Sequence, residues 1–252
     1  MKSIFFFDID GTLTLSGTLP DYNKEMLLKL KSLNHLTFIC SGRPFAYVDK
    51  IFHGLVDGYI LSNGRYIYYH DQVIFDYPLT SQQIEKYSTI CDQYQADYTF
   101  ISDDKFYPNK PRITNDINDP YTKGSIYPWK KEDIKVYVMD IFYQNDTQFN
   151  QLVQAFKNDL ILNNHFGHFS ADTSTINHTK GDGIKKLYEY LNEPLTSYGF
   201  GDGHNDIGMF KEVDYKIAMG NAVQELKDMA TYITTDCNQQ GIIHALKHYR
   251  IF

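Results

Sequence analysis

The amino-terminal part of the chain alternates between short apolar runs and helical patterns. The first run, Ile4 to Phe7, contains no polar residue, which is typical of a strand covered on both faces of a sheet. Similar runs follow at 36–40 and 58–61, and apolar residues recur at helical spacing between the first two runs. Strands that alternate with helices favour a parallel sheet. A hairpin is expected next, with strands at 66–69 and 73–77.

The pattern changes at about Leu79 and returns to its first form after Lys180. The middle segment is expected to contain helices at 84–94 and 149–156 and strands at 96–101, 136–142 and 173–176. Residues 96–101 alternate as in a half-exposed strand, and residues 109–131 are expected to form a loop with at most one short helix. Beyond Lys180, we expect helices at 184–191 and 241–247 and strands at 198–200, 215–219 and 232–234.

These patterns predict an α/β protein with two domains. A doubly wound parallel-sheet core would comprise residues 1–79 and 179–252, and an inserted α+β domain would comprise residues 80–178. The chain has 252 residues, 42% of them hydrophobic, so it is able to bury cores of that size.

The charge and the cysteine content limit the classes of binding partner and the cellular compartment expected for the protein. The formal net charge is −7 and no cluster of Lys and Arg is present, so a nucleic acid is disfavoured as the primary partner. Cys40, Cys91 and Cys237 are widely spaced, which argues against a disulfide framework and a cysteine zinc site. No apolar segment reaches the length of a signal peptide or a membrane span. We therefore expect a cytoplasmic protein without membrane partners, either a monomer or a weak homo-oligomer.

Four polar clusters come directly after predicted strands or open a predicted helix. They are Asp8 with Asp10, Ser41 with Gly42 and Arg43, Lys180, and Asp202 with Asn205 and Asp206. In an open parallel sheet, the strand ends that carry such clusters share one crevice. Crowded carboxylates repel one another unless a cation joins them, and oxygen ligands suit Mg2+ better than zinc. The expected metal ligands are Asp8, Asp202 and Asp206, the last directly or through a water.

The carboxylates and Lys180 suit the transfer of a phosphoryl group. A metal ion offsets the repulsion between a phosphate and an attacking carboxylate, here Asp8, and Lys180 would add a second cation. Asp10 lies two residues later, and the tight turn allowed by Gly11 is able to bring it to the leaving group as a general acid and base.

The second cluster supplies groups that bind phosphate. The Ser41 hydroxyl and the Gly42 amide are donors for phosphate oxygens, and a helix that opens near Pro44 would add free amides. For Arg43, contact with phosphate and pairing with an acidic neighbour are left as equal alternatives.

The ordered set of clusters resembles the haloacid dehalogenase superfamily. Residues Asp8-Ile9-Asp10-Gly11-Thr12 are similar to its first motif, Ser41 to its second, Lys180 to its third and Gly201-Asp202-Gly203-His204-Asn205-Asp206 to its fourth. The resemblance implies that Asp8 is the nucleophile and a metal ligand. It implies that Asp10 is the acid and base and gives a backbone carbonyl to Mg2+. Asp202 would be a direct ligand, and Asn205 would act at the phosphoryl site.

The insert resembles the Cof-type, type IIB branch of that superfamily. The resemblance rests on the insert between Ser41 and Lys180, on Ser62-Asn63-Gly64 and on Ala218-Met219-Gly220-Asn221-Ala222. It implies a Rossmann-like core and an α/β cap that closes over small phosphorylated metabolites, often sugar phosphates. Because the family's ion pumps carry Thr two residues after the nucleophile, Asp10 points to a phosphatase or a phosphomutase.

Two alternatives to a phosphatase remain. A phosphomutase would return the phosphoryl group to the substrate, and a regulatory protein would bind a phosphorylated metabolite without catalysis. His165 and His168 lack the spacing of a metal pair and are expected to be structural, but together with Arg112 they are candidates for contact with the substrate from the cap.

Overall fold

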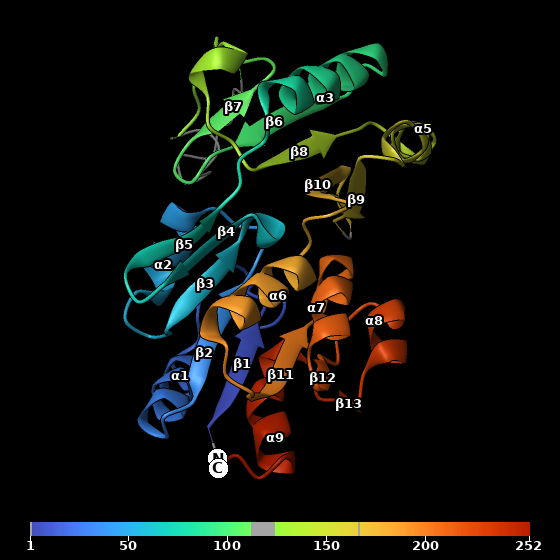
Figure 1. Ribbon diagram of the computed structural model, residues 1–252. Coiled ribbons are helices and arrows are strands. Elements are labelled where there is room, and N and C mark those ends of the chain that lie inside the picture. Colours follow the sequence, from blue (N-terminus) through green and yellow to red (C-terminus); the bar gives the residue numbers. More distant parts are fainter. Residues whose placement is uncertain (1, 112–123, 166) are drawn as a thin grey trace. The chain divides into compact units, whose positions relative to one another are not determined.

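The computed structural model describes residues 2–111, 124–165 and 167–252 (Figure 1). The chain forms two compact units. The first unit contains residues 1–43, 48–76 and 178–252, and the second contains residues 44–47 and 77–177. Arg112 and a large part of the expected loop at 109–131 lie outside the described residues.

The first unit is built on a mixed sheet. Within the described residues, its eight strands lie in the order β13 (Tyr232–Ile233), β12 (Tyr215–Ala218), β11 (Thr196–Gly201), β1 (Ser3–Phe7), β2 (Leu36–Cys40), β3 (Gly58–Leu61), β4 (Tyr66–Tyr69) and β5 (Gln72–Asp76). Strands β13 to β3 are parallel, and the hairpin of β4 and β5 continues the sheet in antiparallel fashion. The predicted α/β core with a parallel sheet is confirmed.

The central strand β1 is buried along its whole length because both of its faces are apolar. The Phe6 ring packs against Phe38, at 6.0 Å between centroids, and Phe5 stacks on Tyr198 at 4.8 Å. Phe7 pairs with Phe200 in the register between β1 and β11, which lie side by side in Figure 1. The loops that follow β1 and β11 therefore leave the sheet at the same edge, side by side.

Helices accompany the strands of the first unit. They are α1 (Asp21–Ser32), α2 (Phe45–Phe52), α6 (Lys180–Leu191), α7 (Ile207–Glu212), α8 (Gln224–Met229) and α9 (Gly241–His248). The first three residues of α2 are grouped with the second unit. A capping box fixes the first residue of α6, because the Thr179 hydroxyl accepts from the Asp182 amide while the Asp182 carboxylate accepts from the Thr179 amide. A short 3-10 helix, η1 (Ser62–Gly64), packs closely on α6. A Cβ at Gly64 would lie only 2.1 Å from the Thr179 carbonyl oxygen.

The second unit contains a separate antiparallel sheet. Among the described residues, its strands lie in the order β7 (Phe106–Pro108), β6 (Asp97–Ile101), β8 (Val138–Phe142), β10 (Ser170–Thr175) and β9 (Leu160–Asn164). Its helices include α3 (Ser81–Gln93), α5 (Asp146–Phe156) and the 3-10 helix η2 (Lys131–Asp133). The α+β character expected for the middle of the chain is present, while β7 and β9 were not predicted.

The strand expected at 96–101 is present as β6, but the expectation that it is half-exposed is wrong. In β6, all residues from Tyr98 to Ile101 are buried. The strand has neighbours on both edges, and its alternating side chains enter two different apolar clusters. Phe100 belongs to the main cluster of the second unit, and Ile101 packs with Phe106 and Val138. Alternation here separates two buried faces, so it does not report exposure to solvent.

Candidate active site

The four polar clusters meet at the carboxyl ends of the strands in the first unit. Asp8 directly follows β1, Ser41 follows β2 and Asp202 follows β11, while Lys180 is the first residue of α6. The Asp8 amide donates to the Phe200 carbonyl oxygen at 3.0 Å, so the pairing of β1 with β11 continues to the edge of the site. The crevice expected from a parallel sheet is therefore the place where these residues gather.

Lys180 joins two of the carboxylates. Its ammonium lies 2.6 Å from Oδ1 of Asp8 and 2.7 Å from Oδ1 of Asp206, and its side chain is fully buried. The nearby Lys185 and Lys186 lie on the surface, where they pair with Glu212 and Glu189. Of these three lysines, Lys180 is the one that the structure places beside the carboxylates.

Asp206 is held by the loop that carries Asp202. It is the last residue of the 3-10 helix η3 (His204–Asp206) and is completely buried. Its Oδ2 accepts hydrogen bonds from the backbone amides of Asp202 at 2.9 Å and Gly203 at 3.0 Å. A Cβ at Gly201 would lie 2.5 Å from the Asp206 carboxylate, so the end of β11 needs a glycine there. Asn205 lies half-buried in the same 3-10 helix.

Asp202 is fixed from the segment that follows Asp8. The Thr12 hydroxyl donates to Oδ1 of Asp202 at 2.9 Å. Gly11 has a φ of +79° and approaches Asp202 so closely that a Cβ on it would lie 2.3 Å from Oδ2. The first and fourth motifs thus pack against each other through a glycine and a threonine. Thr12 stands within the first motif, but no role of its own was expected for it.

Asp10 turns away from the buried cluster and meets Arg43. The Arg43 Nε donates to Oδ2 of Asp10 at 2.9 Å, and both side chains are partly exposed. The Ser41 hydroxyl is buried and accepts a hydrogen bond from the Arg43 amide at 3.2 Å. Of the two alternatives for Arg43, the structure contains the pairing with an acidic neighbour. Gly42 lies between Ser41 and Arg43, three residues before α2 begins at Phe45.

Burial, together with repulsion between the carboxylates, raises the pKa values of two aspartates in the site. Burial raises the pKa of Asp8 well above its ordinary value of 3.8; Lys180 opposes this, and Asp206 and Asp202 add to it. Burial, followed by the charge of Asp206, raises the pKa of Asp202 to about 7. Burial lowers the pKa of Lys180, but the attraction of Asp206 and Asp8 outweighs it, so the net pKa is raised. The ammonium of Lys180 therefore stays charged, whereas Asp8 and Asp202 hold their protons more tightly than exposed carboxyl groups do.

These carboxylates fit a divalent cation. Asp8, Asp202 and Asp206 each offer an oxygen, and the three oxygens lie within 4.8 Å of one another. It is the one such group found among the described residues. Oxygen ligands without His or Cys favour Mg2+ over zinc. His165 and His168 belong to no metal group in the described part of the chain; both are exposed, and His165 Nδ1 lies 2.9 Å from the Ser170 hydroxyl.

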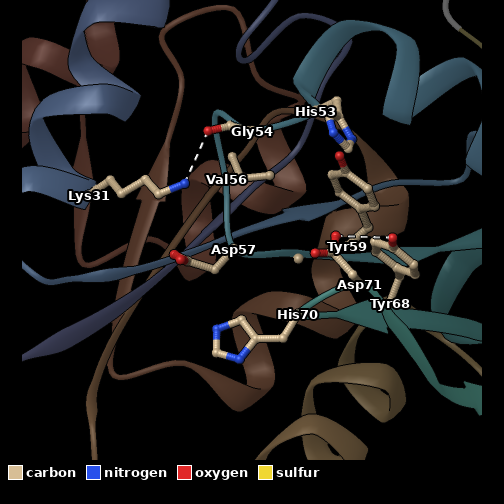
Figure 2. A pocket seen from close by; sticks show the side chains of 10 residues that line it. Lys31, His53, Gly54, Val56, Asp57, Tyr59, Tyr68, His70 and Asp71 are labelled. Carbon is tan, nitrogen blue, oxygen red and sulfur yellow. Dashed lines mark hydrogen bonds between the residues drawn. The ribbon is translucent and has the colours of Figure 1, made fainter.

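A cavity of about 330 Å³ lies at the opposite end of the same sheet (Figure 2). It is lined by Lys31, His53, Gly54, Val56, Asp57, Gly58, Tyr59, Tyr68, His70 and Asp71. Asp57 precedes β3, whereas the second motif and η1 follow the carboxyl ends of β2 and β3. Lys31 donates to the Gly54 carbonyl oxygen at 3.1 Å, and the Tyr68 hydroxyl donates to Asp71 at 3.3 Å. The cavity is separate from the carboxylate site, and these polar groups bind one another.

Sequence comparison relates the whole chain to known enzymes. A family profile described as haloacid dehalogenase-like hydrolase matches residues 5–246. The chain is 29% identical to the putative phosphatase YkrA of Bacillus subtilis (strain 168), over 98% of this chain and 97% of that protein. It is 25% identical to the 5-amino-6-(5-phospho-D-ribitylamino)uracil phosphatase YwtE of the same organism, over 94% of each chain.

Comparison with solved structures gives the same result for the fold. A sugar phosphatase of haloacid dehalogenase subclass IIB superposes with a TM-score of 0.83 at 24% identity, over the full length of both chains.

Within the described residues, no helix combines the length and the apolar character that a membrane span requires. The chain belongs to the haloacid dehalogenase-like hydrolases.

Proposed function

We propose that this enzyme hydrolyses small phosphomonoesters with Mg2+, through a covalent aspartyl-phosphate on Asp8. The observation that carries the proposal is the buried ammonium of Lys180 between Asp8 and Asp206, with Asp202 as a third carboxylate close by. When ionised, the three carboxylates together with one ammonium carry two negative charges in excess, which a divalent cation would balance. Asp8, Asp202, Asp206 and the backbone carbonyl of Asp10 would hold the ion. When bound, Mg2+ would offset the charge of the phosphate and of the attacking carboxylate.

The residues of the chain would act in two steps. Lys180 orients the Asp8 carboxylate by binding Oδ1, and Asp8 attacks phosphorus while Asp10 gives a proton to the departing alcohol oxygen. Asp10 then takes a proton from the water that attacks the phosphorus of the aspartyl-phosphate, which frees phosphate and restores Asp8. The partly exposed position of Asp10 suits a group that must reach both the leaving group and water.

Phosphate would be bound by the second motif and its neighbours. We assign this role to the Ser41 hydroxyl, the Gly42 amide, Lys180 and Asn205. Arg43 pairs with Asp10, so we assign it first to the placement of the general acid and only second to phosphate.

We further propose that residues 80–178 form the cap that selects the substrate, and that residues 1–79 and 179–252 form the catalytic core. The compactness of residues 77–177 as a unit supports this division. Sugar phosphates or related metabolites are the proposed substrates. Relatives that act on a phosphorylated ribityl compound or on sugar phosphates support this class. Cys40, Cys91 and Cys237 are free thiols, which supports a location of the enzyme in the reducing cytoplasm.

The decisive experiment compares the wild-type enzyme with Asp8→Asn across a panel of sugar phosphates, nucleotides and cofactor phosphates. Wild type should release phosphate with Mg2+ and not after chelation, and acid quenching should trap phosphate on the protein. Asp8→Asn should keep the fold and lose both signals. Turnover by Asp8→Asn would contradict the mechanism. Isomer formation without release of phosphate would favour a phosphomutase, and substrate binding without any turnover would favour a regulatory protein.

A further inference from the structure

The loop between β12 and α8 reaches the active site through one side chain. Asn221 belongs to the segment 218–222, to which the catalytic proposal gives no role. Its Nδ2 donates to the carbonyl oxygen of Gly11 at 2.9 Å, and its Oδ1 accepts from the backbone amide of Cys237, also at 2.9 Å. Both ends of the amide are therefore used, and they join two chain segments that are 210 and 16 residues away from Asn221.

The hydrogen bond from Asn221 to Gly11 holds a peptide that is next to the proposed general acid. Gly11 directly follows Asp10, adopts a left-handed conformation and packs on the Asp202 carboxylate. A glycine has wide conformational freedom, so a turn built on it needs external contacts to keep one orientation. Arg43 supplies one such contact through Asp10, Thr12 a second through its hydrogen bond to Asp202, and Asn221 a third through the Gly11 carbonyl.

We infer that Asn221 is a positioning residue, which holds the turn from Asp10 to Thr12 against Asp202 and so fixes the general acid. The inference rests on the proposed function for its catalytic part, but the contact itself exists without metal or substrate. Asn221 also lies 3.5 Å from Oδ2 of Asp202, so it presents an N–H group to both the carbonyl and the carboxylate. A carboxylate in its place could not donate to either acceptor.

The first test measures how firmly the turn is held in the metal-free protein. The amides of Thr12, Leu13 and Thr14 all donate to the Ile9 carbonyl oxygen, so they report opening of this turn. Hydrogen–deuterium exchange of the segment 10–14 should be about tenfold faster in Asn221→Ala than in wild type. Asn238→Ala, a change of an exposed asparagine beside Cys237, should leave the exchange unchanged. Equal exchange in wild type and Asn221→Ala would overturn the inference.

The second test separates placement of the acid from binding of the substrate. Asn221→Asp keeps the shape and the acceptor for the Cys237 amide but loses the donor to Gly11. At saturating Mg2+, kcat should fall about tenfold in both Asn221 variants while KM changes less than about twofold. Unchanged kcat, or a parallel rise of KM that accounts for the loss, would overturn the catalytic role. A wild-type enzyme without Mg2+-dependent turnover would instead refute the proposed function and leave the exchange result standing.

Discussion

The ammonium of Lys180 lies 2.6 Å from Oδ1 of Asp8 although the two residues are 172 positions apart in the chain. Neither side chain has appreciable access to solvent, so the pair is not screened by water as surface ion pairs are. A second carboxylate, that of Asp206, shares the same ammonium. Lys180 therefore contributes both to the stability of the folded protein and to the proposed catalysis.

Replacement of Lys180 by Met should damage both stability and activity. It leaves two buried carboxylates without their cation, and breaking such a pair typically costs about 3–5 kcal/mol. Loss of an electrostatic contact at the reacting group should lower kcat by a factor of about 100 or more. Urea unfolding and phosphate release measure the two effects. Lys186→Met is the matched control on the surface of the same helix and should change stability by less than about 0.5 kcal/mol. Equal behaviour of the two variants would contradict the assignment.

Stability of the metal-free protein should fall as pH rises. Asp202 has a pKa of about 7 in the folded protein against an ordinary value of 3.8, so the folded state binds this proton more tightly than the unfolded state. The stabilising contribution is complete below pH 3.8 and is lost as pH rises toward about 7.

Mg2+ should reverse this trend because it binds the ionised carboxylates. We expect the increase in Tm caused by a fixed Mg2+ concentration to be larger at pH 8 than at pH 6, and to be small in Asp202→Asn. Thermal scans with Mg2+ or with a chelator measure it. A Tm shift that is equal or larger at pH 6 would show that these carboxylates do not bind the ion.

Gly11→Ala should separate backbone strain from collision with Asp202, a proposed metal ligand. The new Cβ would meet Oδ2 of Asp202 at 2.3 Å, so Asp202 must move and Mg2+ affinity should fall at least about tenfold. Gly54→Ala is the matched control, since Gly54 has a similar φ of +74° but open space around its Cα. Each variant should lose about 1–2 kcal/mol to the left-handed backbone. Calorimetric titration with Mg2+ checks the difference, and equal Mg2+ affinities would contradict it.

Arg43→Ala should affect the reaction more than the fold. The ion pair with Asp10 is partly exposed, and such pairs contribute about 1 kcal/mol or less to stability. Because the contact is made through Nε and orients the proposed general acid, kcat should fall about tenfold. Arg43→Lys should not restore it, since an ammonium lacks the planar geometry of the guanidinium. Full activity of Arg43→Lys would indicate that charge alone suffices.

The sequence predicted the core well because its strands are buried on both faces. Ile4 to Phe7 is a continuous apolar run, 36–40 and 58–61 are largely apolar, and each of the three ends at a motif, so the positions of the strands and of the motifs follow from one pattern. The capping box at Thr179 likewise marks the start of α6 from local residues alone.

The parts that were missed depend on contacts between distant segments. Strand β9 ends in two asparagines, and β7 contains a proline, so neither has the composition of a buried strand. The role of Asn221 depends on the approach of Gly11 and Cys237, which no local pattern encodes. Thr12 is similar: its hydroxyl matters because Asp202 is opposite, 190 residues later.

The position of β1 between β2 and β11 also sets when the active site is completed during translation. Asp8, Asp10 and Ser41 leave the ribosome early, but their strand has its second neighbour only when residues 196–201 have been made. Lys180 is made shortly before this strand and the fourth motif directly after it, so the charge cluster is completed late in translation. A nascent or truncated chain that stops within the second unit therefore has an open sheet edge and no catalytic power. The enzyme becomes active only when nearly all of its chain has been translated.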